Sequence, residues 1–428
     1  GKNGDLSRSG ASPHTAPTRL EAGPAWSWHG KGANTLVRAA PLVDGEMNIY
    51  LATISGHVHK FSKDGELLWN YADLSSIPEV PAMAEGALYV TNDLGHITAL
   101  DMETGRVRWK VHPGLKTATD TWSMSAGEGT VVAAMAPAVG PGGENDRLVA
   151  LDSKSGRFKW EYKPDSTVYN SLQTIRNGSL YFSDRNGRLY SVGLEAGEER
   201  WKAGPGRRGE TVSPVMTTGG TALGPNGVFY VTSNAQTATL PPRVSGFVTA
   251  FSSEGEVLWR KPTEYMANNA AAVGPLGEGG RLAVVVGVGE NPDLPYQQLF
   301  GAGDNDTRTK RKDGRVLALD ALTGEEIWRF QMPRWHGAAA GDTMLPDHVC
   351  LPDSFGNPAI SGDGTVYIGF ENGHFYAIND RDGDGKIDAA SGEVSTYDTG
   401  NAFQGSPAIA PGMVVATPCN GMYVFKSM

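Results

Sequence analysis

The chain has 428 residues, of which 20% are charged, and its formal net charge is −10. The longest basic run, 310–312, is too short to form the phosphate-neutralising surface of a nucleic-acid-binding protein. The longest apolar stretch, 282–288, falls far short of the roughly 20 residues that cross a bilayer, so no transmembrane segment is expected. The 56 glycines and 26 prolines favour short strands separated by turns and indicate an all-β protein.

The chain opens with a segment that does not fit the pattern of the rest. Residues 1–22 are predicted to be an N-terminal arm, and residues 23–428 are predicted to form a single domain. That domain begins with Ala25-Trp26-Ser-Trp28, a tryptophan-bearing strand without companion strands of its own.

A repeat follows, in which a turn containing glycine is separated by three residues from a tryptophan. Six copies end in this way, at 61–69, 100–109, 151–160, 192–201, 251–259 and 319–328. A seventh copy, 378–396, keeps Ser391-Gly392 but has Thr396 in place of tryptophan and carries an acidic insertion. Three further strands are predicted upstream of each turn, so that each unit is a four-stranded blade of a propeller.

The last unit ends near Val424 after three strands, and the tryptophan strand at the start of the chain is predicted to complete it. This closure removes an open sheet edge and gives an eight-bladed propeller of four-stranded antiparallel blades. Each repeat tryptophan is predicted to pack between neighbouring blades, with its N–H reaching a carbonyl of the next blade. Asp101, Asp152 and Asp320 are predicted to form turns.

The turn Ala99-Leu-Asp101-x-x-Thr-Gly105-x-x-x-Trp109 and its copies resemble the repeat of the pyrroloquinoline-quinone-like propellers over nearly the whole chain. That superfamily holds quinoprotein alcohol dehydrogenases and the lipoprotein scaffold of outer-membrane protein assembly. The opening segment 4–13 is similar to the start of secreted members. The resemblance therefore implies an extracytoplasmic location, which is secreted, periplasmic or in an organelle lumen.

One stretch is more similar to the dehydrogenases. Segment 287–292 resembles their Gly-x-Gly-Asn-Pro motif, whose asparagine binds the calcium that holds the quinone, and Asn291 is the matching position. Glu290 interrupts the spacing, however, and segment 332–337 has no carboxylate where the dehydrogenases carry their catalytic base. Removal of a hydride from an alcohol needs such a base. This departure argues against a bound pyrroloquinoline quinone.

We therefore expect a non-catalytic scaffold that binds protein partners, as a peripheral subunit of a membrane-associated complex. Two alternatives stay open. One is a quinone- and calcium-dependent alcohol or sugar dehydrogenase with a divergent site, and the other is a glycan-binding propeller.

The acidic insertion has the oxygen spacing of a calcium loop. Carboxylates stand at loop positions 1, 3, 5 and 9 and glycine at position 6, while Ser391 replaces the usual Glu at position 12. A structural calcium is predicted to order this large turn, and a solvated acidic loop is the alternative. The predicted ligand positions are Asp380, Asp382, Asp384, Lys386, Asp388 and Glu393.

Two surfaces are candidates for partner binding. The insertions 292–313 and 332–357 break the repeat length, and their candidate residues are Tyr296, Phe300, Arg334 and Trp335. The mouth of the central channel is expected to hold Arg38, Trp122, Tyr169, Asn268, Asn269, Phe403 and Gln404. Loops that pack over their own blades are the alternative explanation for the first set, and channel water and packing are the alternative explanation for most of the second.

The two cysteines, Cys350 and Cys419, fall in consecutive blades. They are predicted either to form a disulfide or to remain as two buried thiols.

Overall fold

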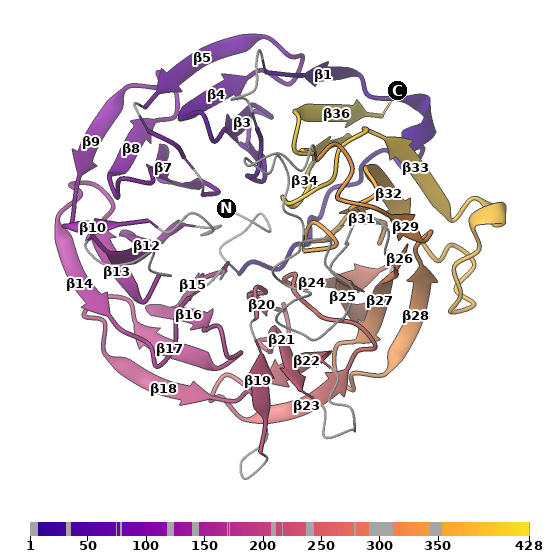
Figure 1. Ribbon diagram of the computed structural model, residues 1–428. Coiled ribbons are helices and arrows are strands. Elements are labelled where there is room, and N and C mark those ends of the chain that lie inside the picture. Colours follow the sequence, from indigo (N-terminus) through magenta and orange to yellow (C-terminus); the bar gives the residue numbers. More distant parts are fainter. Residues whose placement is uncertain are drawn as a thin grey trace.

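The computed structural model describes residues 7–30, 36–73, 75–77, 79–117, 124–138, 145–168, 170, 172–206, 211–215, 217–236, 244–277, 280–290, 311–342 and 353–427. Eight antiparallel sheets radiate from a common centre as the blades of a propeller, which confirms the predicted fold (Figure 1). Six sheets have four strands, and two have a fifth short strand. None of the described segments forms a helix that is long and apolar enough to cross a membrane.

Within each of blades 1 to 7, the strands run in chain order from the channel to the rim, whereas the outermost strand of blade 8 is the first strand of the chain. Blade 1 consists of β2 (Leu42–Val43), β3 (Ile49–Ala52), β4 (His57–Phe61) and β5 (Leu67–Ala72), and blade 2 consists of β6 (Ala82–Ala84), β7 (Ala87–Thr91), β8 (Ile97–Asp101) and β9 (Val107–Val111). Blade 3 consists of β11 (Ser125–Gly127), β12 (Thr130–Pro137), β13 (Arg147–Asp152) and β14 (Phe158–Tyr162), with β10 (Leu115–Lys116) beside β12. Blade 4 consists of β15 (Thr174–Arg176), β16 (Ser179–Ser183), β17 (Leu189–Gly193) and β18 (Glu199–Ala203).

Blades 5 to 8 continue the ring. Blade 5 consists of β20 (Thr221–Leu223), β21 (Phe229–Gln236), β22 (Val244–Phe251) and β23 (Val257–Pro262), with β19 (Ser213–Val215) beside β21. Blade 6 consists of β24 (Ala272–Leu276), β25 (Arg281–Gly289), β27 (Gly314–Asp320) and β28 (Glu326–Gln331), and blade 7 consists of β30 (Ala359–Ile360), β31 (Val366–Gly369), β32 (His374–Ile378) and β33 (Val394–Asp398). Blade 8 consists of β34 (Ala408–Ala410), β35 (Met413–Ala416), β36 (Met422–Lys426) and β1 (Trp26–Trp28). β26 (Arg311–Lys312) and β29 (Trp335–His336) flank β27 and β28 in the chain and form a separate two-stranded sheet, the β26–β29 pair.

The first strand closes the ring. β1 pairs antiparallel with β36, with Trp26 opposite Val424 and Trp28 opposite Met422. Blade 8 is therefore built from both ends of the described chain, as the sequence predicted. This pairing leaves no edge at the seam between the first and last blades.

The repeat tryptophans join neighbouring blades. The indole N–H of Trp109 in blade 2 donates to the carbonyl of Ser153 in blade 3 at 3.0 Å, and Trp160 donates to Leu194 at 2.8 Å. A Cβ on Gly156, in the turn that faces Trp109, would lie 2.8 Å from the indole. Only glycine leaves the ring enough space, and this glycine also adopts a φ of +69°. The repeat Gly and Trp thus form one interblade contact.

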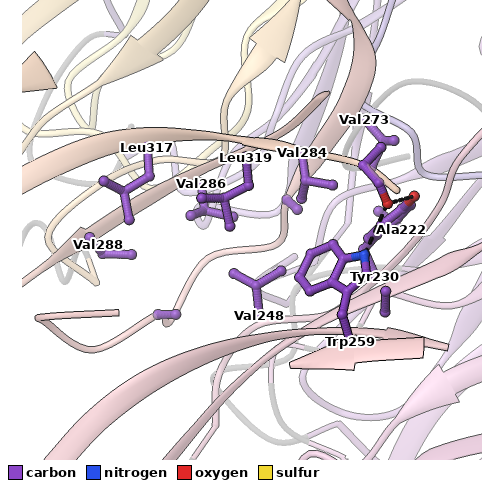
Figure 2. Close-up of a cluster of buried hydrophobic side chains, with 14 residues drawn as sticks. Ala222, Tyr230, Val248, Trp259, Val273, Val284, Val286, Val288, Leu317 and Leu319 are labelled. Carbon is purple, nitrogen blue, oxygen red and sulfur yellow. Dashed lines mark hydrogen bonds between the residues drawn. The ribbon is translucent and has the colours of Figure 1, made fainter. Parts of the chain in front are cut away.

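The contact between blades 5 and 6 shows the same arrangement (Figure 2). Trp259 and Tyr230 of blade 5 both donate to the carbonyl of Ala321 in blade 6, at 3.0 and 2.9 Å. Valines and leucines of β22, β25 and β27 pack around them in a buried cluster. Burial of this apolar surface is the main stabilising contribution at the interface.

Blade 7 lacks the tryptophan, and the arm takes its place. A 3₁₀ helix, η1 (Leu20–Ala22), lies against β33, and Leu20 is completely buried in the cluster between blades 7 and 8. The Leu20 backbone N–H donates to the Ser395 hydroxyl at 2.7 Å, next to the position of Thr396. An apolar side chain from the arm therefore packs where the repeat supplies none.

The interblade contact can be tested with two glycines of blade 3. Gly156 and Gly129 both have positive φ, but a Cβ on Gly129 would meet nothing within 4 Å. Replacement by alanine at either position strains the backbone by about 1–2 kcal/mol. We expect Gly156→Ala to lower the free energy of unfolding by about 1–3 kcal/mol more than Gly129→Ala, because its methyl group overpacks the Trp109 contact. Chemical denaturation of both variants measures the difference, and equal effects would contradict the proposed role of glycine.

Candidate functional site

The two faces of the ring carry different connections. Because strands alternate in direction within a blade, the connections between second and third strands emerge on the same face as those that lead into the next blade. We call this the loop face; the opposite turn face carries the glycine turns that the repeat tryptophans contact. Both long insertions begin and end on the loop face, which makes that end of the channel the candidate site.

The wall of the channel is polar on one side, where blades 5 to 7 meet. Asn234 on β21 donates to the side chain of Asn268, and its own oxygen accepts from the backbone N–H of Ala267 at 2.9 Å. The Thr218 hydroxyl lies 3.0 Å from the Asp353 carboxylate, and the Asn269 amide donates to the Asp353 carbonyl at 3.3 Å. The two asparagines predicted to line the mouth, Asn268 and Asn269, are thus buried and hydrogen-bonded within the wall.

Arg8 of the arm enters the channel on the other side. Its guanidinium donates to the carbonyls of Gln173 at 3.0 Å and Met124 at 2.6 Å, and to the hydroxyl of Ser125 at 2.7 Å. These acceptors precede or begin the inner strands of blades 3 and 4. The side chain is 3% exposed, so a cation that the sequence analysis did not single out lies inside the ring.

A buried carboxyl group, Glu79, lies at the start of blade 2. It is 1% exposed and accepts one hydrogen bond, from the Thr91 hydroxyl at 2.9 Å. Its second oxygen has no hydrogen-bond partner in the structure. Burial raises the pKa of Glu79 to about 8, because the charged form loses its solvation. Glu79 is therefore protonated at neutral pH.

A second buried carboxyl group, Glu371, lies at the top of blade 7. Burial raises the pKa of Glu371 well above its usual range, against the opposing effect of the nearby Lys312 ammonium. Lys312 belongs to β26 of the β26–β29 pair and is completely buried. The sequence analysis missed both acids, and the single signal in the sequence was an acidic residue close to an apolar strand, before β6 for Glu79 and after β31 for Glu371.

The predicted surface residues have different fates. Arg334 is exposed and pairs with Asp313 at 2.9 Å, whereas Trp335 is half-buried and donates to the Ala338 carbonyl at 2.7 Å. Phe403 is 2% exposed and packs on Phe375 between blades 7 and 8, so it belongs to the core and not to a binding surface. Gln404 is also buried, and Arg38 is half-buried. Four other predicted residues lie outside the described part: Trp122, Tyr169, Tyr296 and Phe300.

The cofactor and disulfide predictions can be placed only in part. Asn291 and Cys350 lie outside the described residues, so the geometry of a quinone site cannot be drawn from Asn291. Cys419 is disulfide-bonded and buried against Ala339 and Ala402. The only other cysteine of the sequence is Cys350.

The acidic turn of blade 7 brings three predicted ligands together. Carboxylate oxygens of Asp380, Asp382 and Asp384 all lie within 4.8 Å of one another. One Asp380 oxygen is buried and has no hydrogen-bond partner, while its other oxygen accepts from the Gly385 N–H at 3.1 Å. The three carboxylates face one point, as the ligands of a hard cation do.

Glu393 instead holds the turn closed. One of its oxygens accepts from the N–H of Arg381 and the other from the N–H of Asp388, both at 2.8 Å. These backbone donors lower the pKa of Glu393, because they favour its charged form. Asp388 accepts from the N–H of Ala390 and caps η2 (Ala389–Ser391). The carboxylates at the end of the loop therefore have structural hydrogen bonds whether or not a cation binds.

The pKa of Glu79 predicts a pH dependence of stability. Because the folded-state pKa, about 8, is above the value near 4.3 of an unfolded chain, the folded protein keeps a proton that the unfolded chain loses between these values. The proton on Glu79 stabilises the folded state in full below pH 4.3. As the pH rises from there toward 8, this contribution to the free energy of unfolding declines by roughly 1.4 kcal/mol per pH unit. We expect Glu79→Gln, which keeps the acceptor for Thr91, to abolish this decline in denaturation experiments at pH 5, 6.5 and 8. The exposed Glu66→Gln is the control, and an unchanged slope in Glu79→Gln would contradict the assignment.

Comparisons with known proteins agree with this architecture. The sequence profile of the family described as outer membrane protein assembly factor BamB matches residues 24–206 and 185–426. The serine/threonine-protein kinase AfsK of Streptomyces griseus is 26% identical over 296 residues, which are 64% of this chain and 34% of the kinase. The chain thus matches about a third of that relative's length.

Two solved structures have the same fold. BamB from Moraxella catarrhalis superposes with a TM-score of 0.61 and 16% identity over 94% of this chain and 96% of that one. A europium-containing methanol dehydrogenase superposes with a TM-score of 0.65 and 14% identity over 98% of this chain and 90% of that one. Because the profile matches together span residues 24–426, this chain belongs to the family of propellers described as outer membrane protein assembly factor BamB.

Proposed function

We propose that this protein is a non-catalytic scaffold that acts outside the cytoplasm and binds a protein partner through its loop face. The observation that carries this proposal is the state of the channel wall. Arg8 and the asparagines of blades 5 to 7 form hydrogen bonds with the protein itself. These hydrogen bonds occupy part of the channel wall, and the connecting loops of the loop face remain as a surface for recognition.

The family supports a scaffold in an assembly, since its description names an assembly factor of outer membrane proteins. The loop face also presents groups suited to a protein interface. The Arg334 side chain is 60% exposed, and its guanidinium pairs with Asp313 next to the β26–β29 pair. Arginine is enriched at protein interfaces because its planar group forms several hydrogen bonds at once.

The second candidate function is a quinone-dependent dehydrogenase, and its specific support is the superposition on the methanol dehydrogenase. The quinone would supply the hydride acceptor, and a carboxylate of this chain would take the proton from the alcohol. Segment 332–337 provides none, and Asp342, the nearest carboxylate along the chain, lies five residues beyond that segment. A glycan-binding role has less support, because Phe158 is the one aromatic side chain among the most exposed large apolar residues of the described part.

Partner binding predicts a difference between two arginines of blade 6. Arg334 lies on the loop face, directly before β29. Arg329 lies on the outer strand β28, and its side chain is 53% exposed. We expect Arg334→Glu to reduce the recovery of a cross-linked partner from source cells at least fivefold, while Arg329→Glu leaves it unchanged. Quantitative mass spectrometry of tagged protein gives the measurement. Equal recovery with both variants, or no partner above an untagged control, would contradict the loop-face proposal.

The dehydrogenase alternative has its own test. Protein supplied with pyrroloquinoline quinone and calcium is expected to show no quinone absorbance after gel filtration and no reduction of a dye acceptor with a panel of alcohols. Retained quinone together with dye reduction would replace the scaffold proposal with the enzymatic one.

A structural calcium at the acidic turn is part of the same proposal. Calcium would neutralise the carboxylates of Asp380, Asp382 and Asp384, and a ligand at about 100 times its Kd stabilises a folded protein by about 2.7 kcal/mol. We expect calcium to raise Tm in the unaltered protein and to lose this effect in the double variant Asp382→Asn/Asp384→Asn. Glu325→Gln, on the exposed turn of blade 6, is the matched control. If calorimetric titration detects no calcium binding, the calcium proposal is wrong and the turn is a solvated acidic loop.

A further inference from the structure

The arm crosses the ring instead of hanging from it. From its start near the centre, it passes the inner strands of blades 5 to 8, reaches β33 and continues along the rim to β1 (Figure 1). Residues 7–15 lie along the channel-facing edges of β20, β24 and β30 and the turn after β34. We call this surface the inner groove.

The inner groove binds the arm through its backbone. Four blades contribute, and each of them pairs a main-chain group with the arm, as an added strand does in β-augmentation. The bonds are Leu223 N–H to Ser7 O at 2.8 Å, Val273 N–H to Ser9 O at 2.6 Å, Ile360 N–H to Gly10 O at 2.8 Å, Ser12 N–H to Ile360 O at 2.8 Å, Gly362 N–H to His14 O at 2.9 Å, and Gly412 N–H to Thr15 O at 2.9 Å. Ala11 also forms a parallel bridge with Ile360. Such bonds hold an extended backbone of any sequence.

Side chains add selectivity at two positions. Arg8 reaches across the channel to three oxygens of blades 3 and 4, and a shorter or uncharged side chain would lose these charge-assisted hydrogen bonds. Gly10 has a φ of +67°, and a Cβ there would lie 2.9 Å from the Ala272 Cβ. The groove therefore selects arginine and, two residues later, glycine.

The next position also has limited space. A Cβ on Gly274 of blade 6 would lie 2.8 Å from the Ala11 Cβ, so the groove wall itself is glycine where the arm passes. A cavity of about 190 Å³ lies beside the same stretch of arm, between residues 10–13 and apolar groups of blades 1, 2, 7 and 8. The arm is thus bound along one side and has free space along the other. Residues 7–15 can therefore leave the inner groove while Leu20 stays packed between blades 7 and 8.

We propose that the inner groove is a peptide-binding site for an extended segment of the form Arg-x-Gly-small, occupied in this structure by the chain's own arm, and that a segment of this form supplied in trans takes the arm's place. The ligand is defined by an arginine side chain, by a positive φ at this arginine (+54°) and at the glycine (+67°), and by backbone hydrogen bonds to the inner strands. The inference does not depend on the loop-face partner, since the groove is formed by inner strands and turn-face residues.

In the unaltered chain, the arm competes with an added peptide at an effective concentration in the millimolar range, about that of a short flexible tether. Capture of a peptide is therefore expected only when the arm is weakened. Gly10→Val weakens it through the contact with Ala272, while the rest of the chain is retained. Gly23→Val is the matched control, because Gly23 also has positive φ but its Cβ would meet only Tyr397, at 4.0 Å.

The test uses a fluorescent peptide with the sequence of residues 7–18 and measures its anisotropy with full-length protein. We expect the peptide to bind the Gly10→Val protein at least tenfold more tightly than the unaltered and Gly23→Val proteins. A peptide with Arg8→Ala is expected to bind the Gly10→Val protein at least tenfold more weakly. The proposal is overturned if the first peptide does not bind the Gly10→Val protein, or if both peptides bind it equally.

A second measurement tests the proposal in case the Gly10→Val protein does not fold. A specific protease site placed between Thr18 and Arg19, where the Arg19 side chain is 81% exposed, allows the arm to be cut after folding. The cut fragment is expected to elute with the ring in gel filtration and to be replaced by an excess of labelled peptide, but not by the Arg8→Ala peptide. Loss of the fragment from a ring that remains folded by circular dichroism, without rebinding of the labelled peptide, refutes the proposal.

Discussion

The contact of an indole with a glycine turn on the next blade is the interaction on which the ring depends. Each blade is a small twisted sheet with one apolar surface toward each neighbour, and it cannot bury those surfaces alone. The indole of Trp109 lies over Gly156, and its N–H bonds to a carbonyl of the same turn. The contact therefore fixes both the spacing of the two blades and the direction of the indole between them. The channel and both faces follow from this repetition.

The same constraint explains why the repeat revealed the fold from sequence. Gly and Trp recur at fixed spacing because the contact requires both, and the unmatched strand around Trp26 predicted the closure with β36. Where the constraint is absent, prediction failed. Thr396 replaces the tryptophan of blade 7, and nothing local indicates that Leu20, more than 370 residues earlier, packs nearby.

The channel wall was harder to predict for the same physical reason. Asn268 and Asn269 precede the inner strand β24, but their partners lie in other parts of the wall, and Phe403 proved to be a core residue. Arg8 bonds to residues 116 to 165 positions away. Glu79 and Glu371 acquire raised pKa values from burial, which a single sequence does not display. Repeats predict a scaffold well, whereas its polar interior depends on long-range contacts.

Closure by the first strand also sets an order for biosynthesis. β1 leaves the ribosome about 400 residues before its partner β36, which at typical translation rates is an interval on the order of 20–80 s. Until β36 is available, β1 has no pairing partner in blade 8, and unpaired strands of this kind associate with other chains. A chain that folds outside the cytoplasm can close its ring only after export of its last residues, so its period of greatest aggregation risk ends when the last blade captures the first strand.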